Sequence, residues 1–257
     1  MLQPDRLEML PEVSRTRCLR AIAGAIGWAA IGVAAPARAD GWGGAVSLAS
    51  DKVYRGLSES DGRPVLLLDL DRHTDTGWAA AVGLAGPVHP KQGGSVELTF
   101  GLSKASQLNA DWTLQSAISR HEYPGDARAR SYARTDASLL LAWQGRVFLS
   151  LAVSPDTSAY DAAGSESRRG RAETIELGLH QRLVGRLALD AGIGYFDQRA
   201  LREWGPAGYG YGSIGLGWGV GPVQASLTYI DSQAAERDLA WPSQAGSRWV
   251  AALLWNF

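Results

Sequence analysis

Apolar and polar residues alternate along most of the chain beyond residue 40. At the carboxyl end, Trp249, Ala251, Leu253, Trp255 and Phe257 share one parity. A two-residue period is that of a β-strand with one apolar face. About twelve such segments follow one another, each near the ten-residue length of a tilted membrane-spanning strand. The pattern therefore predicts an all-β chain of about twelve antiparallel strands.

The positions of opposite parity in these segments carry charged and polar side chains. One face of each strand thus suits hydrocarbon, while the other suits water or a packed polar interior. A bilayer does not tolerate open sheet edges, so such strands must close on themselves. We expect a transmembrane antiparallel β-barrel whose lumen is lined by ten candidate residues: Asp69, Asp71, Glu97, Asp111, Arg134, Asp136, Arg146, Glu176, His180 and Asp190.

The connectors between the predicted strands alternate in length. Residues 144–145 and 219–221 form short ones, while 56–62, 155–170 and 231–247 form long ones. This alternation is typical of outer-membrane barrels, which have short periplasmic turns and longer extracellular loops. Aromatic residues follow the same division and predict two interfacial girdles. Trp78, Trp112, Trp143, Trp218 and Trp255 stand near the short connectors, whereas Tyr54, Tyr123, Tyr132, Tyr195, Tyr209, Tyr211, Tyr229 and Trp249 stand near the long ones.

The amino end has the pattern of an export signal. Arg15, Arg17 and Arg20 precede an apolar run at 21–35, and an Ala-x-Ala sequence ends at Ala39. The run of about 15 residues is shorter than a spanning helix requires. We therefore expect residues 1–39 to be a cleaved signal peptide and 40–257 to form a single barrel domain in the outer membrane of a Gram-negative bacterium.

Charge and composition exclude several other functions. The whole chain carries a formal net charge of −1, and removal of residues 1–39 leaves 20 basic and 23 acidic side chains, a net charge of −3. Such a balance does not favour nucleic-acid binding. The one cysteine, Cys18, precedes the expected cleavage point, so we expect no disulfides in the mature domain. No metal-ligand spacing is present, and we expect neither a metal nor a cofactor.

An enzymatic function also finds little support. His180 is the one histidine that the alternation places inward in mid-strand, with Glu176 on the same parity. Four strand positions span roughly 13 Å, too far for a direct catalytic pair. A Gly-x-Ser-x-Gly elbow is absent from the sequence. We therefore expect the protein not to be an enzyme, with an outer-membrane lipid hydrolase as the less favoured alternative.

The segment from Ala45 to Asp71 carries a recognisable motif. Its matching residues are Ser50, Asp51, Tyr54, Arg55, Gly56, Ser58, Ser60, Asp61 and Pro64. This opening resembles that of the TorF porin family, proteobacterial proteins without an assigned solute. The resemblance implies an outer-membrane β-barrel with a porin-like role. One departure is Lys52, where the family pattern has an aromatic residue, and we expect weaker girdle packing at that position.

Arg55 admits two interpretations. It shares its parity with Asp51, so the two side chains can pair, or Arg55 can instead bind a loop carboxylate such as Asp61. Either pair pins the first long loop at the barrel mouth, and Gly56 permits the turn. In the alternative interpretation, Arg55 is a charge at a pore constriction.

The inward charges bear on transport. The predicted lumen holds seven acids against Lys104, Arg134 and Arg146, which favours cations if water fills it. A lumen plugged by cross-strand pairs is the other outcome. We expect a channel for ions or small hydrophilic solutes; the alternative is a closed structural or adhesive barrel that acts through loops such as 155–170. The expected partners are membrane lipid and, through the strand that ends at Phe257, the barrel assembly machinery.

Overall fold

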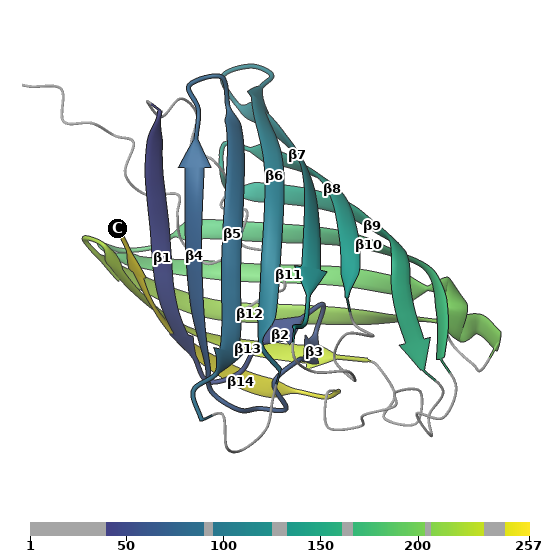
Figure 1. The fold of residues 1–257 in the computed structure, drawn as a ribbon. Coiled ribbons are helices and arrows are strands. Elements are labelled where there is room, and N and C mark those ends of the chain that lie inside the picture. The colour runs from purple at the N-terminus through teal and green to yellow at the C-terminus, as the bar shows by residue number, and fades with distance from the viewer. Residues whose placement is uncertain (1–39, 90–94, 125–132, 161–166, 204–206, 234–244) are drawn as a thin grey trace, which may run out of the picture.

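The structure, a computed structural model, describes residues 40–89, 95–124, 133–160, 167–203, 207–233 and 245–257. Twelve strands form one closed barrel, in which β14 returns to pair with β1 (Figure 1). Every pair of neighbouring barrel strands is antiparallel, which confirms the predicted fold and strand number. The strands are β1 (Gly41–Ala49), β4 (Val65–His73), β5 (Trp78–Pro87), β6 (Glu97–Gln107), β7 (Trp112–Glu122), β8 (Arg134–Trp143), β9 (Val147–Tyr160), β10 (Ser167–Arg182), β11 (Leu187–Gln198), β12 (Gly208–Val220), β13 (Val223–Ser232) and β14 (Arg248–Asn256).

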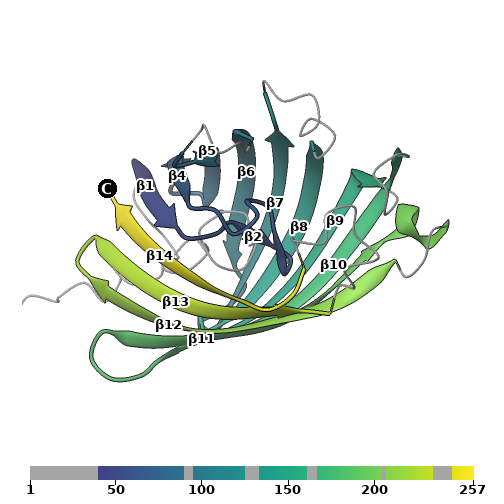
Figure 2. The same cartoon turned by 90° about the horizontal axis from the view of Figure 1, so that it is seen from below.

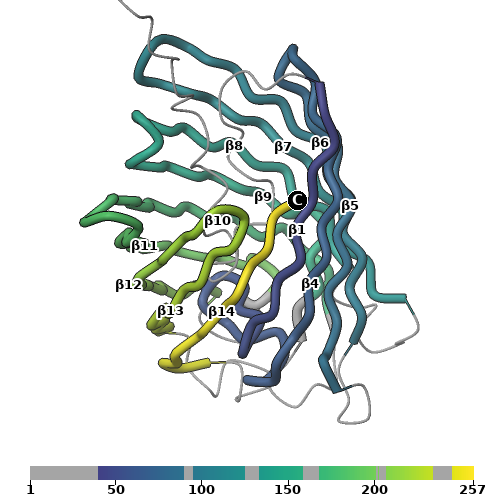
Figure 3. Tube along the Cα trace, turned by 90° about the vertical axis from the view of Figure 1, so that its left-hand side faces the viewer, coloured from purple at the N-terminus to yellow at the C-terminus, as the bar shows by residue number. Residues whose placement is uncertain are grey.

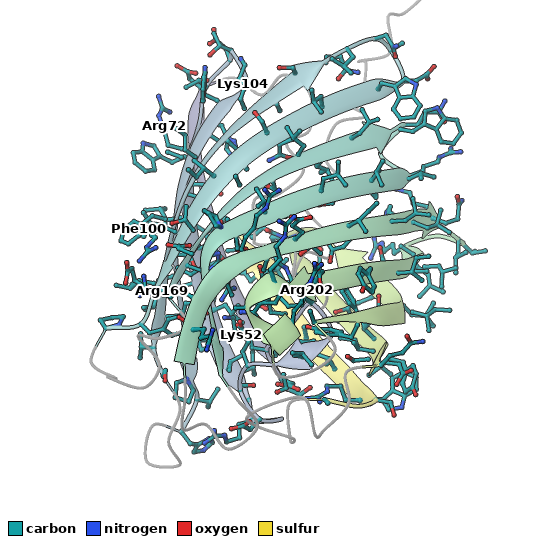
Figure 4. All side chains as sticks on the ribbon, turned by 90° about the vertical axis from the view of Figure 1, so that its right-hand side faces the viewer. Lys52, Arg72, Phe100, Lys104, Arg169 and Arg202 are labelled. Carbon is teal, nitrogen blue, oxygen red and sulfur yellow. The ribbon has the colours of Figure 1, made fainter. Side chains whose placement is uncertain are left out.

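Side chains alternate between the outside of the barrel and its lumen. On β4, Leu66, Leu68 and Leu70 are 50%, 43% and 46% exposed, while Asp69 between them faces inward. Figure 4 shows the same contrast between Phe100, which points away from the barrel, and Lys52, which lies inside it. A continuous exposed band of leucine, valine and aromatic side chains suits lipid and not water. The chain therefore folds as a membrane-spanning barrel.

The barrel closes between its first and last strands (Figure 3). Gly44 and Phe257 exchange two backbone hydrogen bonds of 3.0 Å, one in each direction. The Phe257 ring covers Gly44 so closely that an added Cβ atom at Gly44 would lie 2.6 Å from it. The seam therefore depends on a glycine at position 44.

The connectors sort by length as predicted, with short turns at one end of the barrel and the longer segments at the other. One expected loop is shorter than the alternation indicates. Residues 155–160 and 167–170 continue β9 and β10, where Arg169 pairs with Ser158, and a bulge lies between Gly170 and Ala172. The backbone ladder thus extends beyond the region of apolar alternation, because ladder bonds do not require apolar side chains.

The aromatic girdles form in part. Trp218 and Trp255 are each 50% exposed at the short-turn end, and Tyr229 packs against Trp249 at the long-loop end with ring centres 5.3 Å apart. Tyr123 and Tyr211, in contrast, turn inward and are buried. Their hydroxyls donate to Glu97 and Glu176 in the lumen, which explains why they leave the girdle. Tyr132 lies outside the described residues.

No helix in the described ranges is long and apolar enough to cross a membrane. The short 3-10 helix η3 (Arg199–Glu203) follows β11. The predicted signal peptide, residues 1–39, lies outside the described residues.

Candidate functional site

A small hairpin occupies the lumen at the long-loop end of the barrel. After β1 the chain turns inward and forms β2 (Val53–Tyr54) and β3 (Leu57–Ser58), a separate two-stranded sheet. Figure 2 shows it lying across the barrel mouth. We call residues 51–63 the lumen hairpin.

Local sequence accounts for the shape of the lumen hairpin. Arg55 and Gly56 have φ angles of +51° and +80°, and Tyr54 pairs with Leu57 on either side of them. Two successive positive φ angles in a two-residue loop define a tight hairpin whose twist matches its strands. Arginine rarely adopts this conformation, so contacts made by its side chain must hold it there.

Lys52 anchors the lumen hairpin to β6. Its ammonium group forms ion pairs with Glu97 on that strand and with Glu59 within the hairpin. Burial disfavours the charged form, but Glu59 and Glu97 outweigh it and raise the pKa of Lys52 above its ordinary value. Glu97 also accepts hydrogen bonds from His121 Nδ1 at 2.7 Å and from the Tyr123 hydroxyl at 3.1 Å. The expected girdle position 52 is thus a buried ionic contact in the lumen, a correction to the prediction.

Asp136 on β8 is the second anchor and is buried. The Tyr54 hydroxyl donates to it at 2.9 Å, and the Arg55 guanidinium lies 3.8 Å away. Burial raises the pKa of the Tyr54 phenol above its ordinary value, so the hydroxyl remains a donor. Three wall side chains complete the set around this carboxylate: Arg134, His121 and Ser154.

Four side chains stack in sequence between β8 and β11. The Arg134 guanidinium carbon lies 4.0 Å from the centre of the Tyr54 ring, and that of Arg55 lies 4.5 Å from the same centre. Arg55 is also 5.0 Å from the ring centre of Phe196 on β11. Cations over aromatic faces are attracted by the ring quadrupole. Arg55 is therefore held by two rings and one carboxylate, which accounts for its backbone conformation.

Asp51 fastens the base of the hairpin to β14. Its Oδ2 atom accepts a hydrogen bond of 3.1 Å from Arg248, while Ser58 and Ser60 donate to Oδ1 at 2.6 and 2.7 Å. Arg55 thus pairs with neither Asp51 nor Asp61, contrary to both predicted pairs. Asp61 instead pairs with Arg63 at 2.9 Å.

Apolar and close contacts join the hairpin to β12, β13 and β14. Val53 packs with Ile230 and Val250 in a buried cluster. At the hairpin tip, an added Cβ atom on Gly56 would lie 2.6 Å from Tyr211 Cβ. Gly56 is therefore required both by its positive φ angle and by the close approach of β12.

The anchors lie on opposite sides of the barrel. Counting along the twelve-strand order, β6 and β12 are six steps apart in either direction, and so are β8 and β14. Lys52 reaches β6 while Gly56 abuts β12, and Tyr54 reaches β8 while Asp51 reaches β14. The hairpin therefore spans the bore instead of lining one wall.

The short-turn half of the lumen has a different character. Three inward oxygen atoms there have no hydrogen-bond partner among the described residues: Gln115 Oε1, Asp190 Oδ2 and Gln224 Oε1. His180 Nδ1 lies 2.8 Å from Asp190 Oδ1, and His73 pairs with Asp71. His180 thus pairs across to β11 and not along its own strand with Glu176, which instead accepts a hydrogen bond from Tyr211.

The structure places eight of the ten candidate lumen residues on inward positions of barrel strands, namely Asp69, Asp71, Glu97, Arg134, Asp136, Glu176, His180 and Asp190. Only Glu97, Arg134 and Asp136 join the hairpin network. Asp111 and Arg146 are corrections: both are exposed in short turns, where Asp111 accepts a hydrogen bond of 3.0 Å from Gln144. Each of these two residues lies one position before the first residue of its strand, so the inward parity of the strand does not apply to it.

The motif residues divide between the hairpin and the seam. Asp51, Tyr54, Arg55 and Gly56 lie in the hairpin, whereas the Ser50 hydroxyl accepts a hydrogen bond of 3.0 Å from the Ala251 amide on β14. Sequence reasoning missed His121, Ser154, Arg248 and Glu59. Of these, Arg248 and Glu59 had a detectable signal: Arg248 is a charge at the long-loop end of the last predicted strand, and Glu59 is a charge within the motif segment.

One arrangement resembles a hydrolase triad. His121 Nε2 lies 3.3 Å from Ser119 Oγ, and His121 Nδ1 lies 2.7 Å from Glu97. However, the same Nε2 atom lies 3.5 Å from the Asp136 carboxylate. Both ring nitrogens thus lie within 3.5 Å of a carboxylate, so Ser119 does not have Nε2 to itself but shares it with Asp136. The geometry favours a structural role.

Known structures share this fold at low sequence identity. The NanC porin aligns with a TM-score of 0.55 and 10% identity, over 83% of this chain and 98% of its own. The KdgM porin gives 0.53 and 8%, over 84% and 99%. An outer-membrane channel from Pseudomonas putida F1 gives 0.53 and 13%, over 85% and 95%. At such identities the likeness shows the fold alone.

Comparison at the sequence level adds the family. No curated protein sequence matches the chain. The model of Gcw_chp, described as a bacterial protein of unknown function, matches residues 34–254. The chain therefore belongs to the Gcw_chp family of bacterial proteins.

Proposed function

We propose that the protein is an outer-membrane porin of the TorF type, a channel for the passive diffusion of ions or small hydrophilic solutes. Residues 1–39 direct export, residues 40–257 form the barrel domain, and the C-terminal strand guides barrel assembly. The observation that carries the proposal is the set of inward oxygens of Gln115, Asp190 and Gln224, which have no partner among the described residues. Unpaired acceptors are costly in a dry interior, whereas a water-filled lumen satisfies them.

The porin neighbours support this function. NanC and KdgM are named as porins, and one KdgM structure was solved in complex with disordered oligogalacturonate. A twelve-stranded barrel has a bore between that of a side-chain-filled eight-stranded barrel and that of a sixteen-stranded porin. Such a bore suits small hydrophilic solutes.

The inward charges of the short-turn half favour cations. Asp71 and Asp190 each pair with a histidine, His73 and His180 respectively. Both carboxylates lie on inward positions of barrel strands, and carboxylates that line a water-filled lumen favour cations.

Planar-bilayer recording tests the channel. Purified, folded protein should give discrete conductance steps in potassium chloride, above those of a matched detergent addition. Vesicles that contain the protein should also admit small neutral sugars. Failure to see steps or uptake in the parent and also in a variant with residues 52–63 replaced by a short linker, with each barrel shown to be folded and inserted, would reject the function.

A second candidate is a closed barrel that acts through its extracellular loops. It is favoured by the hairpin that spans the bore. The same recordings decide between the two, because a permanently closed barrel gives no steps whatever its hairpin sequence.

A further inference from the structure

We propose that the lumen hairpin is a plug that closes the channel at its long-loop end, and that its withdrawal from the bore opens the lumen. The proposal rests on the proposed channel function. Its basis is the set of contacts on opposite walls: Glu97 on β6 against Tyr211 on β12, and Asp136 on β8 against Arg248 on β14. A hairpin fixed to one side of the barrel would narrow the bore, whereas a hairpin fixed to four strands around the barrel obstructs it.

The contacts lie at one level of the barrel. Glu97 and Arg248 are the first residues of β6 and β14, and Asp136 is the third residue of β8. All three strands start at the long-loop end, so the hairpin closes that mouth and does not extend into the short-turn half. The oxygens of Gln115, Asp190 and Gln224 that have no partner among the described residues belong to the short-turn half. The lumen thus combines a packed end with a polar chamber.

The charges in the packed end balance. Four bases (Lys52, Arg55, Arg134 and Arg248) face four acids (Asp51, Glu59, Glu97 and Asp136), and each takes part in an ion pair. Their side chains are 4–22% exposed. A buried network in which every carboxylate is paired with a base does not attract a permeant ion, whereas Asp190 in the short-turn half has an oxygen without a partner among the described residues. The network therefore acts as a barrier and not as a selectivity ring.

The hairpin is built to move as a unit. β2 and β3 hydrogen-bond to each other and form a sheet separate from the barrel. The chain leaves the barrel wall before the hairpin and rejoins it afterwards at neighbouring positions, because Ala49 on β1 pairs with Val65 on β4. Withdrawal of residues 51–63 thus breaks side-chain contacts and leaves the barrel ladder intact. Opening by this route does not unfold the barrel.

Two glycines provide a matched test of the plug. Gly56 and Gly62 both have positive φ angles, +80° and +69°, so alanine strains the turn at either position. At Gly56 the new Cβ atom meets Tyr211 at 2.6 Å, whereas at Gly62 nothing lies within 4 Å. Gly56→Ala therefore unseats the hairpin tip, and Gly62→Ala controls for turn strain alone.

The readouts are single-channel conductance and open probability in planar bilayers, for the full-length protein and its variants. We expect Gly56→Ala, and a variant with residues 52–63 replaced by a short Gly-Ser linker, to raise mean conductance roughly threefold or more. Gly62→Ala should match the parent. Heat-dependent gel mobility and circular dichroism confirm that each variant is folded.

A reversible lock tests withdrawal directly. Val53 packs with Val250 on β14, so a Val53→Cys/Val250→Cys pair in a Cys18→Ser background ties the hairpin to the wall. The oxidised protein should lose conductance and the reduced protein should regain it.

The outcomes separate the two proposals. Equal conductance in the parent, Gly56→Ala and the linker variant overturns the plug but leaves the channel intact. Undiminished conductance in the oxidised double-cysteine protein overturns withdrawal. Absence of conductance in every folded variant, including the linker variant, overturns the channel function itself.

Discussion

The guanidinium of Arg134 lies 4.0 Å from the centre of the Tyr54 ring, and these two residues join the barrel wall to the hairpin inside it. Arg55 covers the same ring at 4.5 Å, and the Tyr54 hydroxyl donates to Asp136. Two like charges flank one ring, so the arrangement is stable only because a carboxylate lies beside both. Position 54 thus needs an aromatic face and a hydroxyl at once.

Substitutions at Tyr54 should separate these two requirements. Tyr54→Phe keeps the ring between the guanidinium groups and loses one hydrogen bond to a charged acceptor, at a cost of about 1.5–3 kcal/mol. Tyr54→Leu also loses both cation–π contacts and should cost about 1–2 kcal/mol more. Urea unfolding of the folded barrel in lipid vesicles measures both. Equal destabilisation by the two substitutions would mean that the stack contributes nothing.

Two Asp–Arg contacts in this barrel should differ strongly in strength. Asp136→Asn leaves Arg55 without its buried counter-charge and Arg134 with Glu59 alone, and we expect a loss of about 3–5 kcal/mol. Asp156→Asn removes an ion pair of 2.8 Å with Arg120 whose side chains are 31% and 39% exposed, and it should cost less than about 1 kcal/mol. Unfolding free energies in vesicles compare the two. A similar loss at both sites would contradict the buried network.

The barrel itself was predictable from sequence because its determinants are local. Alternation along one strand decides which side chains face lipid, and connector lengths decide how strands are joined. On β4, Leu66, Leu68 and Leu70 lie outside and Asp69 and Asp71 inside, as the parity indicates. Where a strand ends, the same rule fails, and Asp111 and Arg146 lie in turns.

The hairpin network was not predictable in the same way. Local spacing favoured partners of Arg55 at Asp51 or Asp61, a few residues away. The observed contacts join Tyr54 to Asp136 across 82 positions and Asp51 to Arg248 across 197. Parity also cannot tell whether a loop folds outward or into the bore. For that reason the sequence places Tyr54 in an outer girdle that it does not join, and treats position 52 as a girdle position that Lys52 only weakens.

The seam between β1 and β14 should be sensitive to one added methyl group. In Gly44→Ala, the new Cβ atom would lie 2.6 Å from the Phe257 ring and 2.8 Å from the backbone oxygen of Asp69, and that backbone cannot easily shift. We expect a smaller fraction of folded protein after insertion into vesicles, measured by heat-dependent gel mobility. Gly86→Ala is the control, because its Cβ atom makes only an ordinary contact of 3.5 Å with Val96. Comparable folding of both variants would show that the seam tolerates a side chain.

Substitution by arginine should destabilise the barrel much more at Leu227 than at its neighbour Ser226 on β13. Leu227 is 50% exposed on the outer face in mid-strand, so Leu227→Arg places a charge in hydrocarbon and should cost about 2–4 kcal/mol. Ser226 faces the lumen, where its register partners are Gly217 and Ala252, and Ser226→Arg should be far better tolerated. Unfolding in vesicles gives both values. The reverse order would show that the lipid face has been assigned to the wrong parity.

The selectivity of the channel between cations and anions should depend on the short-turn half of the lumen. Asp190 shares a hydrogen bond with His180 through Oδ1, while its Oδ2 atom has no partner among the described residues. Because this carboxylate faces the lumen, Asp190→Asn should lower the ratio of potassium to chloride permeability by roughly twofold, as read from reversal potentials in a salt gradient. Asp231→Asn removes the same charge from an exposed position at the long-loop end of β13 and should leave the ratio unchanged. If both substitutions shift the reversal potential equally, selectivity arises from the overall charge of the barrel and not from the chamber that Asp190 faces.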